Sequence, residues 1–277
     1  DVASPAQAAL WGFGRSLALE VPGAGSFQFD LDPADPPSGL EALADEVAAR
    51  GEGDRIAWRS GSRRVAELVR TGSAGREDPA GEASGTYLVT GGLGAVGERI
   101  AGWLATRGAR RIVLASRRDP SPGERDRIRA RIAGAEVVFA RADVADRGQI
   151  ERLLDSIEPL AGIVHAAGIL DDALASSLDA ARVEAVLAPK AAGAWLLHEF
   201  TAGTPLESFV LVSSAAGVLG SPGQTAYAAA SAALDALAWR RRALGLPATT
   251  VDWGPWTIGM AAATPASTWR ARGLAPI

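Results

Sequence analysis

The sequence of 277 residues contains no cysteine, two histidines and two tyrosines. The absence of cysteine excludes disulfides, thiol nucleophiles and cysteine-ligated zinc or iron–sulfur sites. Two histidines leave few candidates for a histidine-based triad, and a metal site with several histidine ligands is not expected. No apolar run approaches the roughly 18 residues of a membrane span, and residues 1–5 lack the basic region of a signal peptide. We therefore expect a cytoplasmic protein without a metal.

The charge balance argues against nucleic acid and anionic membranes as partners. The chain has 28 basic and 32 acidic residues, for a net charge of −4, whereas a protein that binds nucleic acid or anionic membranes normally has a basic excess. Hydrophobic residues make up 48% of the chain, which argues against disorder. The length fits one large domain or two small ones with a sizeable core.

Lys190 is the only lysine among the 28 basic residues. In a chain that otherwise uses arginine, it marks a position where arginine would fail, because only lysine offers a compact ammonium on a flexible stem. The alternative is that this lysine persists by chance.

Three segments differ in pattern. Residues 1–70 predict a helix over 6–20, a strand over 26–31, a helix over 40–50 and a hairpin with strands 56–59 and 65–69. Because this unit is short and open-edged, we expect the chain to begin inside a larger structural subdomain. Residues 71–85 are rich in Gly, Ser and acidic residues and predict a linker.

Residues 86–277 alternate strands with helices, which is typical of a parallel sheet covered on both faces. We predict an α/β fold with a doubly wound, Rossmann-like parallel sheet. The predicted strands are 86–90, 111–115, 136–141, 162–165, 209–213 and 249–253. The predicted helices include 96–107, 149–156, 180–200 and 226–244.

A glycine-rich turn links the first of these strands to the following helix. Gly92-x-Gly94-x-x-Gly97 fits the dinucleotide fingerprint in its required strand–turn–helix context. Such glycines let the backbone approach a pyrophosphate at the helix N-terminus. The residues expected at the cofactor are Thr90, Gly91, Gly92, Leu93, Gly94, Ala95, Val96 and Gly97.

The end of the second strand indicates which dinucleotide binds. An NAD enzyme normally places an acidic residue there, but this chain has Ser116, Arg117 and Arg118. A hydroxyl and two guanidinium groups suit the 2′-phosphate of NADP(H). The alternative is that both arginines are only solvated.

Two further strand ends should face the cofactor. After the third strand, Asp143, beside Val144, can accept a hydrogen bond from the adenine amino group. After the fourth strand, the small residues Ala166, Ala167 and Gly168 let the backbone approach the ribose. We expect His165 and His198 to be structural.

Ser214 closes the fifth strand, and Tyr227 opens the next helix 13 residues later. With Lys190 they converge on the carboxyl edge of one sheet. Tyr227 can give a proton to a carbonyl oxygen that gains charge during hydride transfer, and Ser214 can give a hydrogen bond. A nearby ammonium stabilises a phenolate and makes the phenol a better acid.

These residues form the Ser–Tyr–Lys set of short-chain dehydrogenase/reductases, except that the usual position of lysine, four residues after tyrosine, holds Ser231. With lysine on the preceding helix, the chain resembles the ketoreductase domains of modular type I polyketide synthases. The resemblance covers 86–277 densely and also residues 7–20, the late part of a truncated N-terminal Rossmann-like structural subdomain. The residues that carry it include 90–97, 116–118, 165–168, 213–217, 223–230 and Trp253-Gly254-Pro255-Trp256, of which Pro255 and Trp256 are expected at the cofactor.

The resemblance implies NADPH-dependent reduction of a β-ketoacyl chain held on an acyl carrier protein, alongside neighbouring synthase domains. The family normally has asparagine at the position of Ser231, which lies on the Tyr227 face of its helix. We expect Ser231 to touch the lysine–water network still, and turnover to persist.

The resemblance also predicts stereochemistry. Leu170-Asp171-Asp172 resembles the marker of B-type domains, which give a D-configured alcohol, and Leu219 replaces the tryptophan of A-type domains. With Gln224, these residues are expected to control how the substrate enters. Epimerising B-type domains carry two prolines near the tyrosine. Here Pro222 fills one position and Ala229 occupies the other, so we expect no epimerisation.

Two alternatives remain. A non-reducing scaffold or epimerase of the same family would usually lose the tyrosine, the lysine or the glycine loop, and all three are present. A free-standing reductase of a soluble metabolite is disfavoured by the leading segment 1–70, and an interaction module has no other support.

Overall fold

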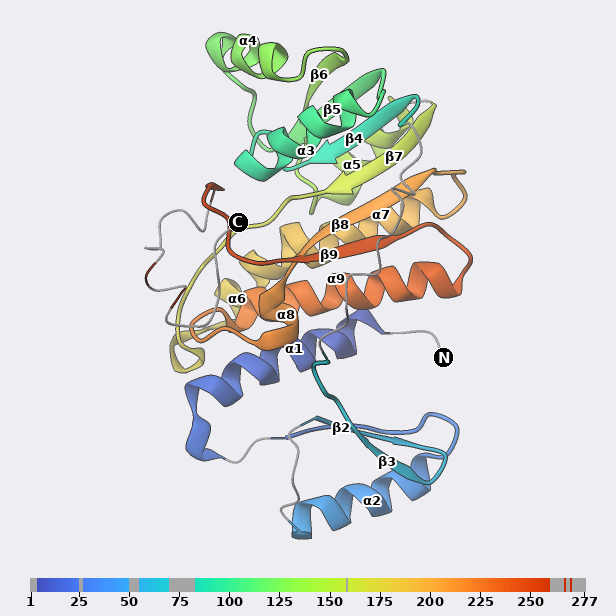
Figure 1. Cartoon of the computed structure of the whole chain (residues 1–277), viewed down its shortest axis with the longest axis vertical. Helices are drawn as coiled ribbons and strands as arrows, with labels where there is room; N and C mark the ends of the chain where they lie inside the picture. Colours follow the sequence, from blue (N-terminus) through green and yellow to red (C-terminus); the bar gives the residue numbers. More distant parts are fainter. Residues whose placement is uncertain are drawn as a thin grey trace.

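The protein is described from a computed structural model. The described residues are 4–24, 27–49, 55–69, 83–157 and 159–259, together with 267 and 270. They contain a six-stranded sheet flanked by helices and a separate three-stranded sheet near the N-terminus (Figure 1).

The six-stranded sheet is parallel throughout, in the order β6-β5-β4-β7-β8-β9. The order reverses direction beside β4, since β5 lies on one side of it and β7 on the other. Such a switch point opens a crevice at the carboxyl ends of the strands. The strands are β4 (Thr86–Thr90), β5 (Arg111–Ser116), β6 (Glu136–Arg141), β7 (Leu160–His165), β8 (Ser208–Ser214) and β9 (Thr249–Trp253).

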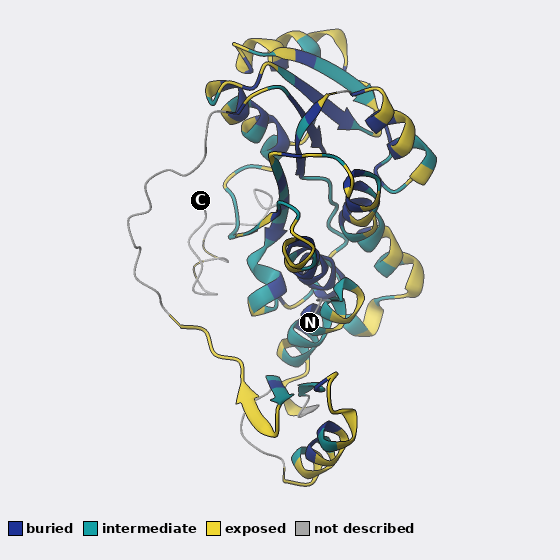
Figure 2. Cartoon of the chain, turned by 90° about the vertical axis from the view of Figure 1, so that its right-hand side faces the viewer, coloured by how far each residue is buried: buried dark blue, intermediate teal, exposed yellow. Residues whose placement is uncertain are grey.

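Helices cover both faces of this sheet, and each face has its own apolar core. One core includes Leu104 and Ile128 with the strand residue Ile112, and the other includes Leu197 and Leu234 with Phe209. Figure 2 shows the sheet as the most deeply buried layer. This is the predicted doubly wound α/β fold. The helices of this segment are α3 (Ala95–Thr106), α4 (Pro122–Arg131), α5 (Arg147–Asp155), α6 (Ala180–Leu187), α7 (Gly193–Thr201), α8 (Ala215–Leu219) and α9 (Thr225–Ala243), with the 3-10 turn η2 (Ala175–Ser177).

The prediction of one continuous helix over 180–200 is wrong in the middle of that range. A π-helical segment, η3 (Ala188–Ala192), separates α6 from α7. Pro189 lies inside it and has no N–H to continue the α-helical ladder. The wider turn falls at Lys190, and π-segments of this kind frequently occur at functional sites.

The N-terminal segment contains α1 (Pro5–Glu20), η1 (Pro22–Ala24), β1 (Gln28–Asp30), α2 (Pro36–Ala49), β2 (Arg55–Arg59) and β3 (Ser62–Val65). β1 and β2 are parallel, and β3 is antiparallel to β2. β3 begins earlier than the sequence predicts, because Ser60 and Gly61 take positive φ angles of 51° and 72° and close the hairpin in two residues.

α1 packs along α9 and so belongs with the large sheet rather than the small one (Figure 1). Gly12 makes this approach possible: a Cβ there would lie 2.3 Å from the carbonyl oxygen of Ala228. Residues 71–82, most of the predicted linker 71–85, lie outside the described residues. None of the helices that the structure describes is both long and apolar enough to span a membrane.

Candidate active site

A cavity of about 1130 Å³ lies at the carboxyl ends of the parallel strands, at the switch point beside β4. It gathers nearly all of the residues that the sequence predicts for the cofactor and the chemistry. Predicted residues that line it are Thr90, Gly91, Leu93, Gly94, Ala95, Val96, Gly97, Ser116, Arg117, Arg118, Asp143, Val144, Ala166, Ala167, Gly168, Leu170, Asp172, Lys190, Ser214, Leu219, Gln224, Tyr227, Pro255 and Trp256. Gly92, Asp171 and Ser231 do not line it.

The glycine loop is shaped as a cradle. Gly91 takes φ 67°, in the left-handed region, and a Cβ on it would lie 2.7 Å from the carbonyl oxygen of Ala166. A Cβ on Gly97 would lie 2.4 Å from the carbonyl oxygen of Gly91, so the helix packs directly on the turn. Glycine backbone therefore forms part of the wall beside the start of α3, which fits a pyrophosphate.

The two arginines after β5 differ in their partners. Arg118 donates to both carboxylate oxygens of Glu124, at 2.7 and 2.9 Å, and Glu124 also closes the capping box of α4. This pairing, together with hydrogen bonds from Ser121, lowers the pKa of Glu124 to about 2. Arg117 is exposed at the cavity and makes no hydrogen bond or ion pair with any residue that the structure describes. Arg117 is thus the guanidinium available to a ligand phosphate.

The other predicted cofactor contacts lie at the ends of β6 and β7. The Asp143 Oδ1 atom accepts a hydrogen bond from the Ala145 backbone at 3.0 Å, which fixes the carboxylate at the cavity wall. The small residues Ala166, Ala167 and Gly168 also line the cavity. These positions fit the adenosine half of a dinucleotide.

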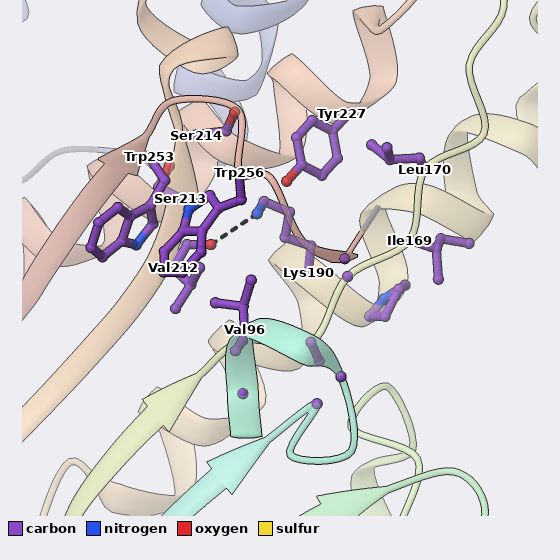
Figure 3. A pocket seen from close by; sticks show the side chains of 18 of the residues that line it. Val96, Ile169, Leu170, Lys190, Val212, Ser213, Ser214, Tyr227, Trp253 and Trp256 are labelled. Carbon is purple, nitrogen blue, oxygen red and sulfur yellow. Dashed lines mark hydrogen bonds between the residues drawn. The ribbon is translucent and has the colours of Figure 1, made fainter. Parts of the chain in front are cut away.

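Lys190 and Tyr227 lie side by side at the opposite end of the cavity (Figure 3). The Lys190 Nζ atom lies 4.7 Å from the centroid of the Tyr227 ring and donates a hydrogen bond to the Val212 carbonyl oxygen at 2.9 Å. Lys190 is only 3% exposed. Among the described residues its ammonium contacts the Tyr227 ring and the Val212 carbonyl oxygen but no carboxylate.

His165 is hydrogen-bonded to the backbone of Lys190. Its Nε2 lies 2.8 Å from the Lys190 carbonyl oxygen, and its Nδ1 lies 2.7 Å from the Thr90 hydroxyl. A carbonyl oxygen can only accept, so Nε2 carries the proton and the Thr90 hydroxyl donates to Nδ1. Burial lowers the pKa of His165 to about 4, with the neighbouring Lys190 charge acting in the same direction. His165 is structural, as the sequence predicts, and it stays neutral at physiological pH.

His198 also makes structural contacts. Its Nδ1 lies 3.1 Å from a guanidinium nitrogen of Arg241, which is fully buried. Its ring meets Trp195 edge to face, with the centroids 5.3 Å apart. It lies away from the cavity.

The serines near Tyr227 have different roles. Ser214 lines the cavity, and its hydroxyl accepts a hydrogen bond from the Ala216 backbone at 3.2 Å as the N-cap of α8. Ser231 is fully buried, and its hydroxyl donates to the Tyr227 carbonyl oxygen at 2.9 Å. The Ser231 hydroxyl thus bonds back to its own helix, and Ser231 does not line the cavity.

The segment predicted to control stereochemistry is held in place by polar contacts. Leu170 points into the cavity region (Figure 3), whereas Asp171 forms a bidentate ion pair with Arg182 and turns away from the cavity. Asp172 accepts from the Gln224 amide at 3.1 and 3.3 Å. Leu219, on α8, is 44% exposed at the cavity rim.

Several cavity residues are not predicted from the sequence. Val212 supplies the carbonyl oxygen that binds Lys190, and Trp253 stacks edge to face on Trp256 with centroids 4.8 Å apart. Val212 lies two residues before the end of β8, and Trp253 ends β9; since both strand ends face the cavity, the position near the strand end could have identified them. Leu19, at the end of α1, also lines the cavity, but no local pattern shows that α1 reaches the site.

Comparisons with known proteins agree with this geometry. A model of the KR domain family matches residues 85–258. The chain belongs to the KR domain family. It is a ketoreductase domain of the modular polyketide synthase type, with the fold of the short-chain dehydrogenase/reductases.

Two similar relatives are large synthases. "Polyketide synthase GfsB" of Streptomyces halstedii is 43% identical over 269 residues, which cover 91% of this ketoreductase chain and 5% of that protein. "Pikromycin polyketide synthase component PikAII" of Streptomyces venezuelae is 43% identical over 265 residues, 88% of this chain and 7% of that one. The ketoreductase chain thus spans a small part of these relatives.

Solved ketoreductases have the same fold. A-type ketoreductases from a modular polyketide synthase match with a TM-score of 0.83 and 40% identity, over 96% of this chain and 57% of that one. A C2-type ketoreductase matches with a TM-score of 0.86 and 32% identity, over 99% and 60%. Because domains of different types match equally well, overall similarity does not assign the stereochemical type.

Proposed function

We propose that this ketoreductase uses NADPH to reduce a β-ketoacyl chain, carried as a thioester on an acyl carrier protein, to a β-hydroxyacyl chain. The observation that carries the proposal is the placement of the Lys190 ammonium 4.7 Å from the centroid of the Tyr227 ring, inside the cavity that holds the glycine loop. An ammonium beside a phenol suits proton donation to a developing alkoxide.

NADPH, when bound, supplies the hydride for the carbonyl carbon. Tyr227 gives its phenolic proton to the carbonyl oxygen, and the Ser214 hydroxyl donates a hydrogen bond to the same oxygen. Lys190 stabilises the phenolate that remains. The Val212 carbonyl oxygen and the neutral His165 keep Lys190 at this position from its two ends.

The preference for NADPH over NADH rests on Arg117. Its guanidinium is exposed at the cavity after β5, where the ribose of a dinucleotide lies in this fold, and none of the acidic residues that the structure describes pairs with it. Arginine recognises phosphate with two parallel donors.

We further propose B-type stereochemistry, giving a D-configured alcohol, without epimerisation of an α-branch. Leu170 and Asp172 line the cavity, Asp172 bonds to Gln224, and Leu219 stands where an A-type domain has tryptophan. Pro222 without a second proline at Ala229 argues against epimerisation. Segments on the two sides of the cleft then decide which face of the ketone meets the hydride.

The partners in this proposal are the acyl carrier protein and neighbouring synthase domains, and the compartment is the cytoplasm. The relatives that support it are polyketide synthases by name. A similar ketoreductase comes from the first module of phoslactomycin biosynthesis, which points to the same modular setting.

The test compares the wild-type domain with Tyr227→Phe on a β-ketoacyl thioester, following NADPH oxidation and hydroxyacyl product. The wild type should reduce the thioester, and Tyr227→Phe should abolish reduction while NADPH binding, measured by fluorescence titration, stays nearly intact.

A wild-type domain that binds NADPH without reducing the thioester would support the non-reducing scaffold or epimerase instead. Reduction by Tyr227→Phe at about a tenth of the wild-type rate or more would remove Tyr227 from its role.

A further inference from the structure

Glu20, the last residue of α1, binds two segments that are remote from it in the sequence. Its Oε2 atom accepts a hydrogen bond from the Ala175 backbone at 2.6 Å. Its Oε1 atom accepts from the Gly223 backbone and from the Thr225 hydroxyl, each at 2.8 Å. One carboxylate therefore joins the segment after β7 to the segment before α9.

These two segments lie side by side at the cavity mouth. Residues 169–175, which we call the β7 loop, contribute Leu170 and Asp172 to the cavity wall, and residues 220–225, the α9 loop, contribute Pro222 and Gln224. The loops also bond to each other, because Ala173 donates from its backbone to the Gly223 carbonyl oxygen at 2.8 Å. Both loops line the cavity that contains Tyr227, so their placement limits how an acyl chain can lie beside it.

α1 holds Glu20 at a fixed place relative to both loops. The Arg15 guanidinium donates to the Gly217 carbonyl oxygen at 2.6 Å, and the Ser16 hydroxyl, fully buried, accepts from the Ser221 backbone at 3.1 Å. Leu19, next to Glu20, itself lines the cavity. The end of α1 is thus a wall of the site, although α1 carries no residue of the predicted chemistry.

The charge state of Glu20 suits this role. Partial burial raises the pKa of its carboxyl, but the hydrogen bonds from Ala175, Gly223 and Thr225 outweigh burial and hold the pKa below its usual value. Glu20 is therefore ionised at neutral pH, and an ionised carboxylate only accepts hydrogen bonds, which matches three donors. Charge-assisted bonds of this type are stronger than neutral ones.

We propose that Glu20 is a positioning residue for the acyl substrate: by joining the β7 loop to the α9 loop, it fixes the cavity mouth and thereby the face of the ketone that meets the hydride. This inference rests on the proposed reductase function. It assigns a specificity role to the N-terminal segment, outside residues 85–258 that match the family model.

The variants are Glu20→Ala, Glu20→Gln and the control Glu46→Gln. Alanine removes all three contacts. Glutamine keeps the shape but has one acceptor oxygen, so in either orientation of its amide one backbone N–H, of Ala175 or of Gly223, faces an NH2 group. Glu46 pairs with Arg63 in the same N-terminal segment, away from both loops, so Glu46→Gln controls for loss of a carboxylate there.

Each variant is assayed with a diketide thioester for kcat, KM and product enantiomer ratio, and by titration for NADPH affinity. Glu20→Ala should raise KM and erode the enantiomer ratio by about tenfold each, the scale of a lost charge-assisted hydrogen bond. Glu20→Gln should also raise KM and erode the enantiomer ratio, but by smaller factors than Glu20→Ala. NADPH affinity should match the wild type in all variants, because the glycine loop and Arg117 lie at the other end of the cavity.

Unchanged KM and enantiomer ratio in Glu20→Ala and Glu20→Gln, with an active wild type, would overturn the role of Glu20 alone. Parallel loss of NADPH affinity and thioester turnover would also overturn it, since this would show general destabilisation. An inactive wild type would instead overturn the proposed function. If Glu20→Ala does not fold, Glu20→Gln decides by the same readouts.

Discussion

The imidazole of His165 donates a hydrogen bond to the carbonyl oxygen of Lys190 at 2.8 Å, and so ties the π-helical segment that carries the lysine to the end of β7. The Lys190 side chain is held separately, by the Val212 carbonyl oxygen at the end of β8. Two neighbouring strands thus fix the two ends of one lysine. This explains how a lysine outside the Tyr227 helix can serve the same phenol.

The buried His165 predicts a dependence of stability on pH. Its pKa is about 4 in the folded chain, against 6.5 without perturbation, so between these values the unfolded chain binds more protons. The stabilisation is complete above pH 6.5 and is lost as the pH falls through 6.5 towards 4, by up to about 3 kcal/mol. Urea unfolding from about pH 4 to 7 measures this slope. His165→Gln should reduce the slope of the unfolding free energy against pH. His198→Gln should leave the contribution of His165 to that slope unchanged. An unchanged slope in His165→Gln would contradict the assignment.

Arg117 predicts cofactor selectivity. Arg117→Ala should weaken NADPH binding about ten- to a hundredfold and leave NADH binding nearly unchanged, because only NADPH carries the 2′-phosphate that a charged hydrogen bond can reach. Titration with both cofactors measures the difference. Equal losses for the two cofactors would refute the phosphate contact.

Arg118→Ala is the matched control for Arg117, since Arg118 already pairs with Glu124 through both guanidinium donors. We expect it to change NADPH affinity less than Arg117→Ala does. A larger effect at Arg118 would mean that the ion pair opens when the cofactor binds, and would exchange the roles of the two arginines.

Much of the site can be predicted because it lies where parallel strands end. The strands 86–90, 136–141 and 249–253 have the predicted bounds, since near-continuous apolar runs between helices are strong local signals. Tyr227, Ser214 and Lys190 stand out in the sequence because each is rare in the chain or follows a strand.

The remainder depends on contacts between distant parts of the chain. Glu20 lies 155 positions before Ala175 and 203 before Gly223, and nothing around it in the sequence indicates which loops its carboxylate meets. The helical period places Ser231 on the correct face, but the direction of its hydroxyl depends on competition with the backbone carbonyl of Tyr227. Pro189 is a sequence signal for a break in the helix near Lys190, but it does not specify that the chain forms a π-helical turn there.

Ser231 yields a third prediction. The sequence predicts that Ser231→Asn leaves activity unchanged or raises it, by restoring the usual side chain of the family. The structure adds a cost in stability: the site is fully buried, and extra atoms in a packed core typically cost about 1–3 kcal/mol. Urea unfolding and thioester reduction, measured below the unfolding transition, separate the two effects.

Ser231→Ala is the control and should keep activity, because within the described residues the lost hydroxyl bonds only to Tyr227's carbonyl oxygen. A large loss of activity in the folded Ser231→Asn variant would show that the site has adapted to serine.

The last prediction concerns the configuration of the product. Leu170 lies at the cavity, Asp171 is drawn away by Arg182, and Asp172 is bonded to Gln224, so the β7 loop is held against the segment before Tyr227. Leu219, smaller than the tryptophan of A-type domains, lines the cavity from α8. The acyl chain should therefore enter from the side that gives a D-configured alcohol, while the phenol and the hydride donor keep their positions. Chiral chromatography of the product from a diketide thioester measures the outcome. A predominantly L-configured alcohol would refute the B-type assignment even if reduction is fast, because reduction requires only Tyr227 and its neighbours, whereas configuration depends on the loops.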